Sequence, residues 1–265
     1  MLLTLPASLP ANEHRTPATS GIPPNPPRPA FYALAPGGWR DYVTLLHLPY
    51  TLWHVSYVVI GAALAPEFPK GRVALTVAAF FLALGIAAHA LDELRGRPLQ
   101  TRIPAPVLVG LATAALAAAV AIGLAVAVTW NLWLLPFIAV GAFLVCAYNL
   151  ELFGGRFHKR LWFALAWGAF PVLTGYFAAA GEIRAEALLA ALFATLLSFV
   201  QHVLSTPVRH LRRRVASVSG TIELRDGRRE PIDETTLIAA PELALRALSG
   251  ATVALAAALL VLRLT

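Results

Sequence analysis

Polar and ionisable side chains gather at the ends of several long apolar runs in this sequence. Such groups are costly inside a membrane, so each needs a partner or a function. Imidazole, carboxylate, phenol, amide and guanidinium groups can bind metal ions and phosphates or transfer protons. We expect four sets of them to meet in one chamber at one end of a helical bundle. The sets are His47 and His54; His89, Asp92 and Glu93; Tyr148, Asn149 and Glu151; and Gln201, His202, Ser205, Thr206 and Arg209.

Helical spacing places members of the second set on a common face. His89, Asp92 and Glu93 are three and four residues apart, so their side chains point the same way. A site for a divalent metal is one interpretation. The other is an interfacial acidic pair, Asp92 and Glu93, that is neutralised by Arg95 and Arg97.

The remaining sets also leave alternatives open. Gln201 and Ser205 are four residues apart and share a helical face. His47 and His54 are either catalytic or make ordinary hydrogen bonds between helices. The basic run 209–214 either anchors the protein to anionic lipid headgroups or grips a phosphate-bearing substrate.

The composition places these groups in a membrane protein. Of the 265 residues, 58% are hydrophobic and only 13% are charged, about half the charged share of a soluble domain. Too few charged residues remain to cover a water-soluble surface, so soluble globular and disordered proteins are excluded. The single cysteine, Cys146, excludes a disulfide framework or a cysteine-based metal site. Membrane topology explains the net charge of +7 better than nucleic-acid binding does.

Uncharged runs long enough to cross a bilayer predict an all-α, multi-span transmembrane bundle of about seven helices. The run 103–150 holds no charged residue and is too long for one span, so it folds back near Trp130 and Trp133. Many Ala and Gly residues favour close packing of the helices. The predicted spans are 42–66, 73–91, two within 103–150, 161–181, 187–207 and 241–264.

Two segments lie outside these spans. Residues 1–40 are rich in proline and predict a disordered cytoplasmic tail, which precedes a transmembrane domain at 41–265. A cytoplasmic loop is expected at 208–240. Within that loop, the Asp226 and Gly227 pair at the centre of 218–232 is a weak signal for a β-hairpin.

The positions of Lys and Arg predict the orientation. With the amino terminus in the cytoplasm, most of the 21 Lys and Arg residues lie inside, and only Lys70, Arg72, Arg184 and Arg263 lie outside. We therefore expect an integral protein of a bacterial inner membrane with a cytoplasmic amino terminus. A retinal-binding photoreceptor is excluded because the two lysines, Lys70 and Lys159, both lie in loops and cannot form a Schiff base within the membrane.

Three stretches resemble the UbiA family of intramembrane prenyltransferases. The first is similar to the end of the family's second helix, where an Asp-rich motif is followed by Arg-Pro-Leu. The second is similar to the family's Tyr, basic pair and Gly-x-x-Pro-x-x-x-Gly pattern, and the third falls at its second Asp-rich motif. The stretches are 89–104; Tyr148 with Lys159, Arg160 and 168–175; and 201–209.

The resemblance implies a reaction and roles for residues. Family members transfer an isoprenyl chain from a diphosphate to a lipid or aromatic acceptor, in a cavity on the cytoplasmic side. Two Asp-rich motifs hold Mg²⁺ against the diphosphate. Carried onto this chain, the catalytic residues are Asp92, Glu93 and Tyr148; the metal-binding residues are Asp92, Glu93, His89 and His202; and the substrate contacts are Arg97, Asn149, Lys159, Arg160, Gln201, Ser205 and Arg209.

The chain departs from the family's pattern mainly in its carboxylates. When Asp92 is aligned with the middle Asp of the first motif, His89 and Gly96 stand where Asp is expected. Gln201 and Ser205 stand where the second motif has Asp, and neither is a good magnesium ligand. Another divalent metal, bound through His89 and His202, is therefore an alternative to Mg²⁺. The family also has nine spans rather than seven.

Two other functions remain open beside prenyl transfer. A metal-dependent membrane enzyme of another class would use the converging His and carboxylate groups. A non-catalytic protein of the same fold, either a lipid binder or a partner subunit, would explain the missing Asp ligands. The expected partners are membrane lipid, an isoprenyl diphosphate and a hydrophobic or aromatic acceptor, and not nucleic acid.

Overall fold

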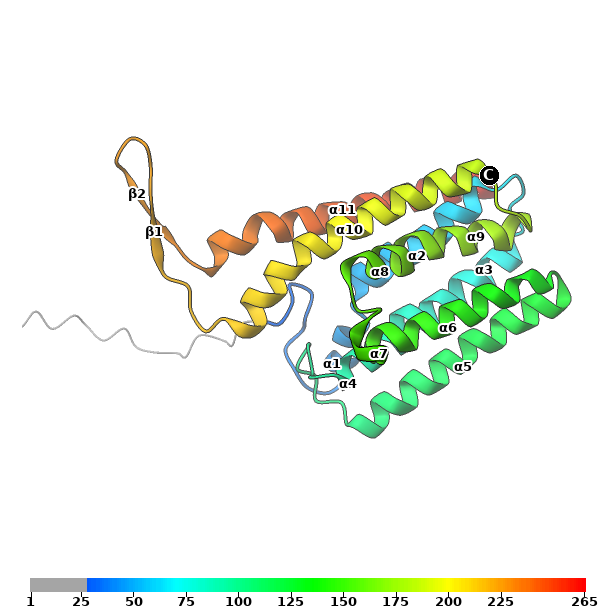
Figure 1. Cartoon of the computed structure of the whole chain (residues 1–265), viewed down its shortest axis with the longest axis horizontal. Helices are drawn as coiled ribbons and strands as arrows, with labels where there is room; N and C mark the ends of the chain where they lie inside the picture. Colours follow the sequence, from blue (N-terminus) through cyan, green and yellow to red (C-terminus); the bar gives the residue numbers. More distant parts are fainter. Residues whose placement is uncertain (1–27) are drawn as a thin grey trace, which may run out of the picture.

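The computed structural model describes residues 28–265, which form a helical bundle with a small β-hairpin projecting from one end (Figure 1). The carboxyl terminus lies at the opposite end of the bundle. In chain order the elements are α1 (Trp39–Leu45), α2 (Leu48–Leu64), α3 (Lys70–Phe80), η1 (Phe81–Ala88), α4 (His89–Leu94), α5 (Ala105–Thr129), η2 (Leu132–Leu134), α6 (Leu135–Asn149), α7 (Leu152–Gly155), α8 (Arg160–Ala164), η3 (Leu165–Ala169), α9 (Phe170–Ala180), α10 (Ala185–Arg214), β1 (Gly220–Glu223), β2 (Arg229–Ile232) and α11 (Glu234–Leu264).

The predicted all-α, multi-span bundle is confirmed. Within residues 28–265, six helices are long and apolar enough to cross a membrane, and the count rises to seven if α1 and α2 form one bent span. The six are Lys70–Leu94, Ala105–Thr129, Leu132–Asn149, Arg160–Ala180, Ala185–Arg214 and Glu234–Leu264.

The first predicted span is broken rather than continuous, because α1 and α2 meet at an angle of 43°. His47, between them, adopts a left-handed backbone with a φ of 45°. Pro49 lies in the first turn of α2 and has no N–H to continue the hydrogen bonds of α1. The hydroxyl of Thr51 donates to the carbonyl oxygen of Leu46 at 2.6 Å, so the break leaves that oxygen satisfied.

The loop predicted at 208–240 is shorter than expected. Helix α10 continues to Arg214, and α11 begins at Glu234, where the Asp233 side chain accepts a hydrogen bond from the backbone N–H of Thr236 at 2.7 Å. Hydropathy alone did not predict the last helical turns of α10 or the first helical turns of α11, because these turns carry charged residues. Between the two helices, β1 and β2 pair in antiparallel fashion, so the hairpin prediction is confirmed.

The tail expected over 1–40 needs a correction at its end. Residues 1–27 lie outside the described part of the chain, but residues 28–36 pack on the bundle. Ala33 is buried in a small apolar cluster with Leu99. The segment turns at Phe31 and Tyr32, where the N–H of Ala33 donates to the carbonyl oxygen of Ala30 at 3.1 Å, and its alanine and aromatic side chains give it apolar surface to bury.

Two of the membrane helices contain a π-helical segment, η1 after α3 and η3 after α8. A π-helical turn is wider than an α-helical one and changes which partners its carbonyl groups have. The carbonyl oxygen of Trp167 in η3 accepts a hydrogen bond from Nδ1 of His54 at 2.8 Å. This bond joins α2 to η3, so of the two interpretations of His54 the structure supports an interhelical hydrogen bond.

Helices α2 and α9 cross closely because glycine stands at the crossing. A Cβ atom at Gly61 would overlap the backbone of Val172, and one at Gly175 would overlap the backbone of Val58. The crossing places α2 in the core of the bundle. Residues near the start of α2 also line the polar end of the bundle. The small residues predicted to favour close packing are therefore used at specific positions.

Gly175→Ala should destabilise the protein by about 1–3 kcal/mol, because α2 and α9 must separate to admit the methyl group. Gly250→Ala is the matched control, since nothing lies within 4 Å of a Cβ atom there. Alanine is the better helix former at that exposed site, so this variant should unfold at the same temperature or slightly higher. Thermal unfolding of purified protein in detergent measures both. Equal melting temperatures for the two variants would contradict the close crossing.

Candidate functional site

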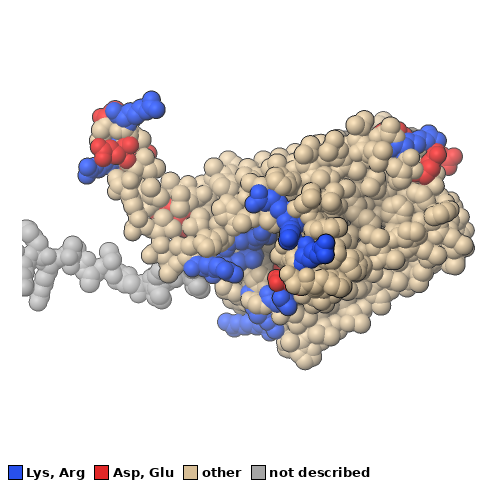
Figure 2. Space-filling view, viewed as in Figure 1, with Lys and Arg blue, Asp and Glu red and all other residues tan. Residues whose placement is uncertain are grey.

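A polar chamber of about 620 Å³ lies among the helix ends near the hairpin. Its walls come from α2, η1 and α4, the end of α6, η3 and α10, together with residues 29–32 and the loop after α4. Figure 2 shows Lys and Arg gathered at this end of the bundle, with a long uncharged surface beside it and a smaller charged group at the far end. We call this the basic end. The predicted convergence of polar side chains from separate helices is therefore observed.

Most of the residues predicted for the site line the chamber. They come from helices that are far apart in sequence, and packing of the bundle brings them together. The lining residues among those predicted are His89, Asp92, Arg97, Tyr148, Asn149, Gln201, Ser205 and Arg209.

Glu93 is the clearest correction. Its side chain is 1% exposed and turns away from the chamber. One carboxylate oxygen accepts hydrogen bonds from the backbone N–H and the hydroxyl of Thr101, both at 2.9 Å, and the other accepts from the N–H of Leu99 at 3.0 Å. Glu93 therefore holds the loop after α4, and its lone pairs are not available to a metal or a substrate.

Three other predicted residues lie outside the chamber lining. Lys159 is the exposed residue before α8, and the guanidinium of Arg160 lies over the ring of Phe199, 5.6 Å from its centroid. His202 packs edge-on against Phe163, with ring centroids 5.2 Å apart. Since Gln201 and Ser205 occupy the inward face of α10, the residue after Gln201 points elsewhere. His89 and His202 therefore do not share a site.

Several residues that line the chamber were missed or undervalued by sequence reasoning. Tyr32 comes from the segment expected to be disordered, and its hydroxyl lies 3.0 Å from Nδ1 of His47. Burial raises the pKa of the Tyr32 phenol, so it stays neutral. The ring of His47 stacks on that of His89, with centroids 4.0 Å apart and an angle of 13° between planes. His158, in a loop before α8, packs on the ring of Tyr148 at 4.5 Å.

Strained backbone is concentrated at the chamber. A positive φ is unfavourable for residues other than glycine and often marks a functional site. Such residues within 28–265 are His47, Arg97, Gln100, Glu151 and Phe153, and all but Phe153 line the chamber. Tertiary contacts therefore keep the backbone of these four residues in a conformation that is unfavourable in free energy.

The carboxylates near the basic end differ in what they contact. Asp41 accepts backbone hydrogen bonds from Gly37 and Arg102, both at 2.8 Å. Glu242 pairs with Arg212 at 2.5 and 2.9 Å, which joins α10 to α11. The Asp92 side chain faces the chamber and has no hydrogen bond or ion pair within residues 28–265; its backbone carbonyl accepts a hydrogen bond from the N–H of Arg95 at 3.0 Å. Of these three carboxylates, Asp92 is therefore the one whose oxygens are free to bind a ligand or accept a proton.

Gln201 is a second unpartnered group. Its side chain is 3% exposed and lines the chamber, and its Oε1 atom has no hydrogen-bond partner in the described part of the chain. A buried amide without a partner costs free energy, about 1–3 kcal/mol. Oε1 therefore lines the chamber with its capacity to accept a hydrogen bond unused by the described residues.

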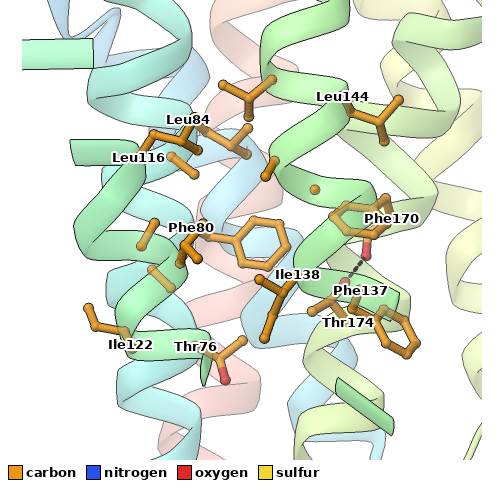
Figure 3. Close-up of a pocket in the computed structure, with 18 of the residues that line it drawn as sticks. Thr76, Phe80, Leu84, Leu116, Ile122, Phe137, Ile138, Leu144, Phe170 and Thr174 are labelled. Carbon is orange, nitrogen blue, oxygen red and sulfur yellow. Dashed lines mark hydrogen bonds between the residues drawn. The ribbon is translucent and has the colours of Figure 1, made fainter. Parts of the chain in front are cut away.

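Figure 3 shows an apolar groove elsewhere between the helices. It lies between α3, η1, α5, α6 and α9, holds about 100 Å³, and is lined by side chains such as Phe80, Ile138 and Phe170. Leu84 of η1 and Trp167 of η3 line both the groove and the chamber, so the two spaces meet at the π-helical segments. The combined site has one polar and one apolar part.

The side chains facing the chamber do not fit the pair of magnesium sites that the family resemblance implies. That arrangement needs carboxylates from two helices, whereas α10 offers the neutral Gln201 and Ser205. Glu151, the other acidic lining residue, pairs with Arg95 at 2.9 Å. Within residues 28–265 no group of three or more His, Cys, Asp or Glu side chains is placed to hold a metal ion.

Comparisons with protein-family models, with curated proteins and with solved structures found no match to this chain. Its function is therefore inferred from the chamber, the groove and the resemblance of its motifs.

Glu93→Ala should lower the free energy of unfolding by about 2–3 kcal/mol, because it leaves the buried N–H groups of Leu99 and Thr101 without a partner. Asp92→Ala should change it by less than about 0.5 kcal/mol, since the Asp92 side chain has no hydrogen-bond or ion-pair partner within the described chain. Thermal unfolding of both variants in detergent checks this difference. A larger loss for Asp92→Ala than for Glu93→Ala would reverse the assigned roles.

Proposed function

We propose that this chain is a UbiA-like intramembrane prenyltransferase. It transfers an isoprenyl chain from a diphosphate donor to a hydrophobic or aromatic acceptor. The observation that carries the proposal is the junction of a basic, polar chamber with an apolar groove at Leu84 and Trp167. An isoprenyl diphosphate has the same division, with a polyanionic head and a hydrocarbon tail.

The donor fits the site in one direction. Its diphosphate lies in the chamber near Arg209 and Arg213, and guanidinium groups bind phosphate oxygens well because of their planar set of donors. Its tail enters the groove between α5, α6 and α9, whose volume of about 100 Å³ takes only part of a long chain, and burial of each methylene there adds about 0.8 kcal/mol. The reacting C1 atom then sits where chamber and groove meet.

At that junction the chain supplies an aromatic wall. The ring of Tyr148 lies 5.5 Å from that of Trp167 and 6.0 Å from that of Phe163. When the C1–O bond breaks, the pyrophosphate leaves with the electron pair and positive charge develops on the allylic chain. Aromatic faces stabilise such a cation by about 0.5–2 kcal/mol each. The acceptor then bonds to C1, and Asp92 takes the proton that the acceptor releases.

The membrane setting is part of the proposal. A cytoplasmic amino terminus places the basic end on the inner side of the plasma membrane of a bacterium, in accord with the preference of Lys and Arg for that side. The chamber then receives a water-soluble or amphiphilic acceptor from the cytoplasm. The groove receives its hydrocarbon chain from the lipid phase.

A non-catalytic lipid binder of the same fold is the second candidate. It is favoured by two observations: Glu93 holds a loop, and α10 carries the neutral Gln201 and Ser205 on its chamber-lining face. Such a protein binds the diphosphate lipid and releases it unchanged. Release of pyrophosphate separates the two candidates.

Purified protein in lipid nanodiscs, incubated with tritium-labelled geranylgeranyl diphosphate and a panel of aromatic and lipid acceptors, should form a labelled adduct and release pyrophosphate. Asp92→Asn should lower the transfer rate at least about a hundredfold, because the acceptor's proton then has no base. Arg225→Gln, in the exposed hairpin, is the control and should transfer at the normal rate. Binding without any pyrophosphate release would favour the lipid binder, and no binding at all would refute both.

Ala142→Phe should weaken binding of a long-chain donor about tenfold, because the new ring fills the groove that Ala142 lines. Ala139→Phe lies on the same helix but is exposed, so it makes the same change in volume away from the groove. Binding of labelled geranylgeranyl and dimethylallyl diphosphates by both variants measures the effect. The loss should be confined to Ala142→Phe and to the longer donor; an equal loss for the short donor would place the tail elsewhere.

A further inference from the structure

The charges that line the chamber are strongly unbalanced. The arginines among its lining residues are Arg95, Arg97, Arg209, Arg213 and Arg214, and the carboxylates are Asp92 and Glu151. Arg95 and Glu151 pair with each other. The other four arginines have no carboxylate partner within residues 28–265, and only Asp92 opposes them.

Two of these arginines are half-buried and well placed. Arg209 and Arg213 are four residues apart on α10, so they share the face that lines the chamber. Both contact neutral oxygens: Arg213 Nε donates to the carbonyl of Pro29 at 3.3 Å, and Arg209 Nη2 donates to the hydroxyl of Thr206 at 3.4 Å. Their positive charge is therefore held at the chamber and left uncompensated.

Arg212 shows that uncompensated positive charge is a property of the chamber-lining face of α10 and not of the whole basic run 209–214. Arg212 points to the other side of α10 and is neutralised by Glu242. An anchor for lipid headgroups needs only exposed positive charge. A helix that neutralises one arginine and aims others into a cavity is suited to bind an anion there.

The neutral side chains on α10 suit direct contact with that anion. Gln201 lies on the chamber-lining face, about two turns before Arg209, so the N–H groups of its amide can donate into the chamber, while its Oε1 is an acceptor and does not contact an anion. An amide N–H or a serine O–H donates to a phosphate oxygen, whereas a carboxylate at the same place repels it unless a cation lies between them. Gln201 and Ser205 thus remove the repulsion that a metal would otherwise have to offset.

We propose, on the basis of the function proposed above, that this chamber binds the diphosphate of its donor directly and without a divalent cation. Arg209 and Arg213, with Arg97 from the loop after α4, supply the positive charge that neutralises the head group. The amide N–H groups of Gln201 donate hydrogen bonds to its oxygens. The hydroxyl of Ser205 does the same by turning away from the carbonyl oxygen of His202, to which it donates at 3.4 Å. When the C1–O bond breaks, the same arginines hold the departing pyrophosphate.

The proposal reverses the expected role of Asp92 in binding. In a site bridged by metal, the aspartate binds the cation, so its removal weakens donor binding. In a site without metal, the carboxylate repels the diphosphate across the chamber, so its removal strengthens binding. The sign of the effect of Asp92→Asn therefore distinguishes the two arrangements.

Equilibrium binding of tritium-labelled geranylgeranyl diphosphate to the full-length protein in phosphatidylcholine nanodiscs tests the proposal, with EDTA or with millimolar MgCl₂. We expect affinities that agree within about twofold in the two buffers. Arg209→Gln and Arg213→Gln should each weaken binding about tenfold in EDTA, and Asp92→Asn should strengthen it about threefold. Inorganic pyrophosphate should displace the label, and phosphatidylglycerol in the nanodisc should not.

The control variant is Arg225→Gln, which makes the same charge change in the exposed hairpin and should bind like the unaltered protein. Because Arg213 also contacts the segment 28–36, Arg209→Gln provides a second variant, and each is checked by thermal unfolding. Binding that requires Mg²⁺ and weakens in Asp92→Asn would overturn this proposal and leave prenyl transfer standing. Absence of binding in both buffers would overturn the proposed function itself.

Discussion

The cost of placing polar groups inside an apolar bundle governs this structure. Every ionisable group near the basic end must be hydrogen-bonded, paired or turned toward a hydrated space. Asp41 and Glu93 hold backbone N–H groups of nearby loops, and Glu242 neutralises Arg212 between α10 and α11. The groups left without such a partner include Asp92, Gln201, Arg209 and Arg213, and all four line the chamber. Polar groups without a partner in the described chain are thus concentrated in the chamber.

The same constraint links the chamber to the groove. The π-helical segments η1 and η3 supply Leu84 and Trp167, which line both spaces, and the carbonyl of Trp167 is satisfied by His54 from α2. An amphiphile with a phosphorylated head therefore meets matching surroundings along its length. Segment 28–36 closes part of the cytoplasm-facing wall in the proposed orientation, since Tyr32 bonds His47 and Arg213 donates to Pro29.

Much of the architecture was predictable because hydropathy reports directly on burial in lipid. Long uncharged runs predicted the membrane helices, and the polar sets at their ends predicted a shared chamber that holds residues such as Tyr148 and Arg209. Charged helical turns were missed, because α10 and α11 continue beyond their apolar parts. Tyr32 was missed because a proline-rich segment resembles disorder when its packing partner, His47, is not known.

The sequence by itself determined the membrane class of the protein, its helical character and the residue types at the polar ends of its apolar helices, because these depend on local composition and spacing. Only the tertiary structure decided which of two adjacent carboxylates is free. Asp92 and Glu93 are one residue apart on α4, yet a helix turns successive side chains by about 100°, so one faces the chamber and the other the loop that it holds. Neighbouring Arg212 and Arg213 on α10 are separated in the same way, since their partners come from distant parts of the chain.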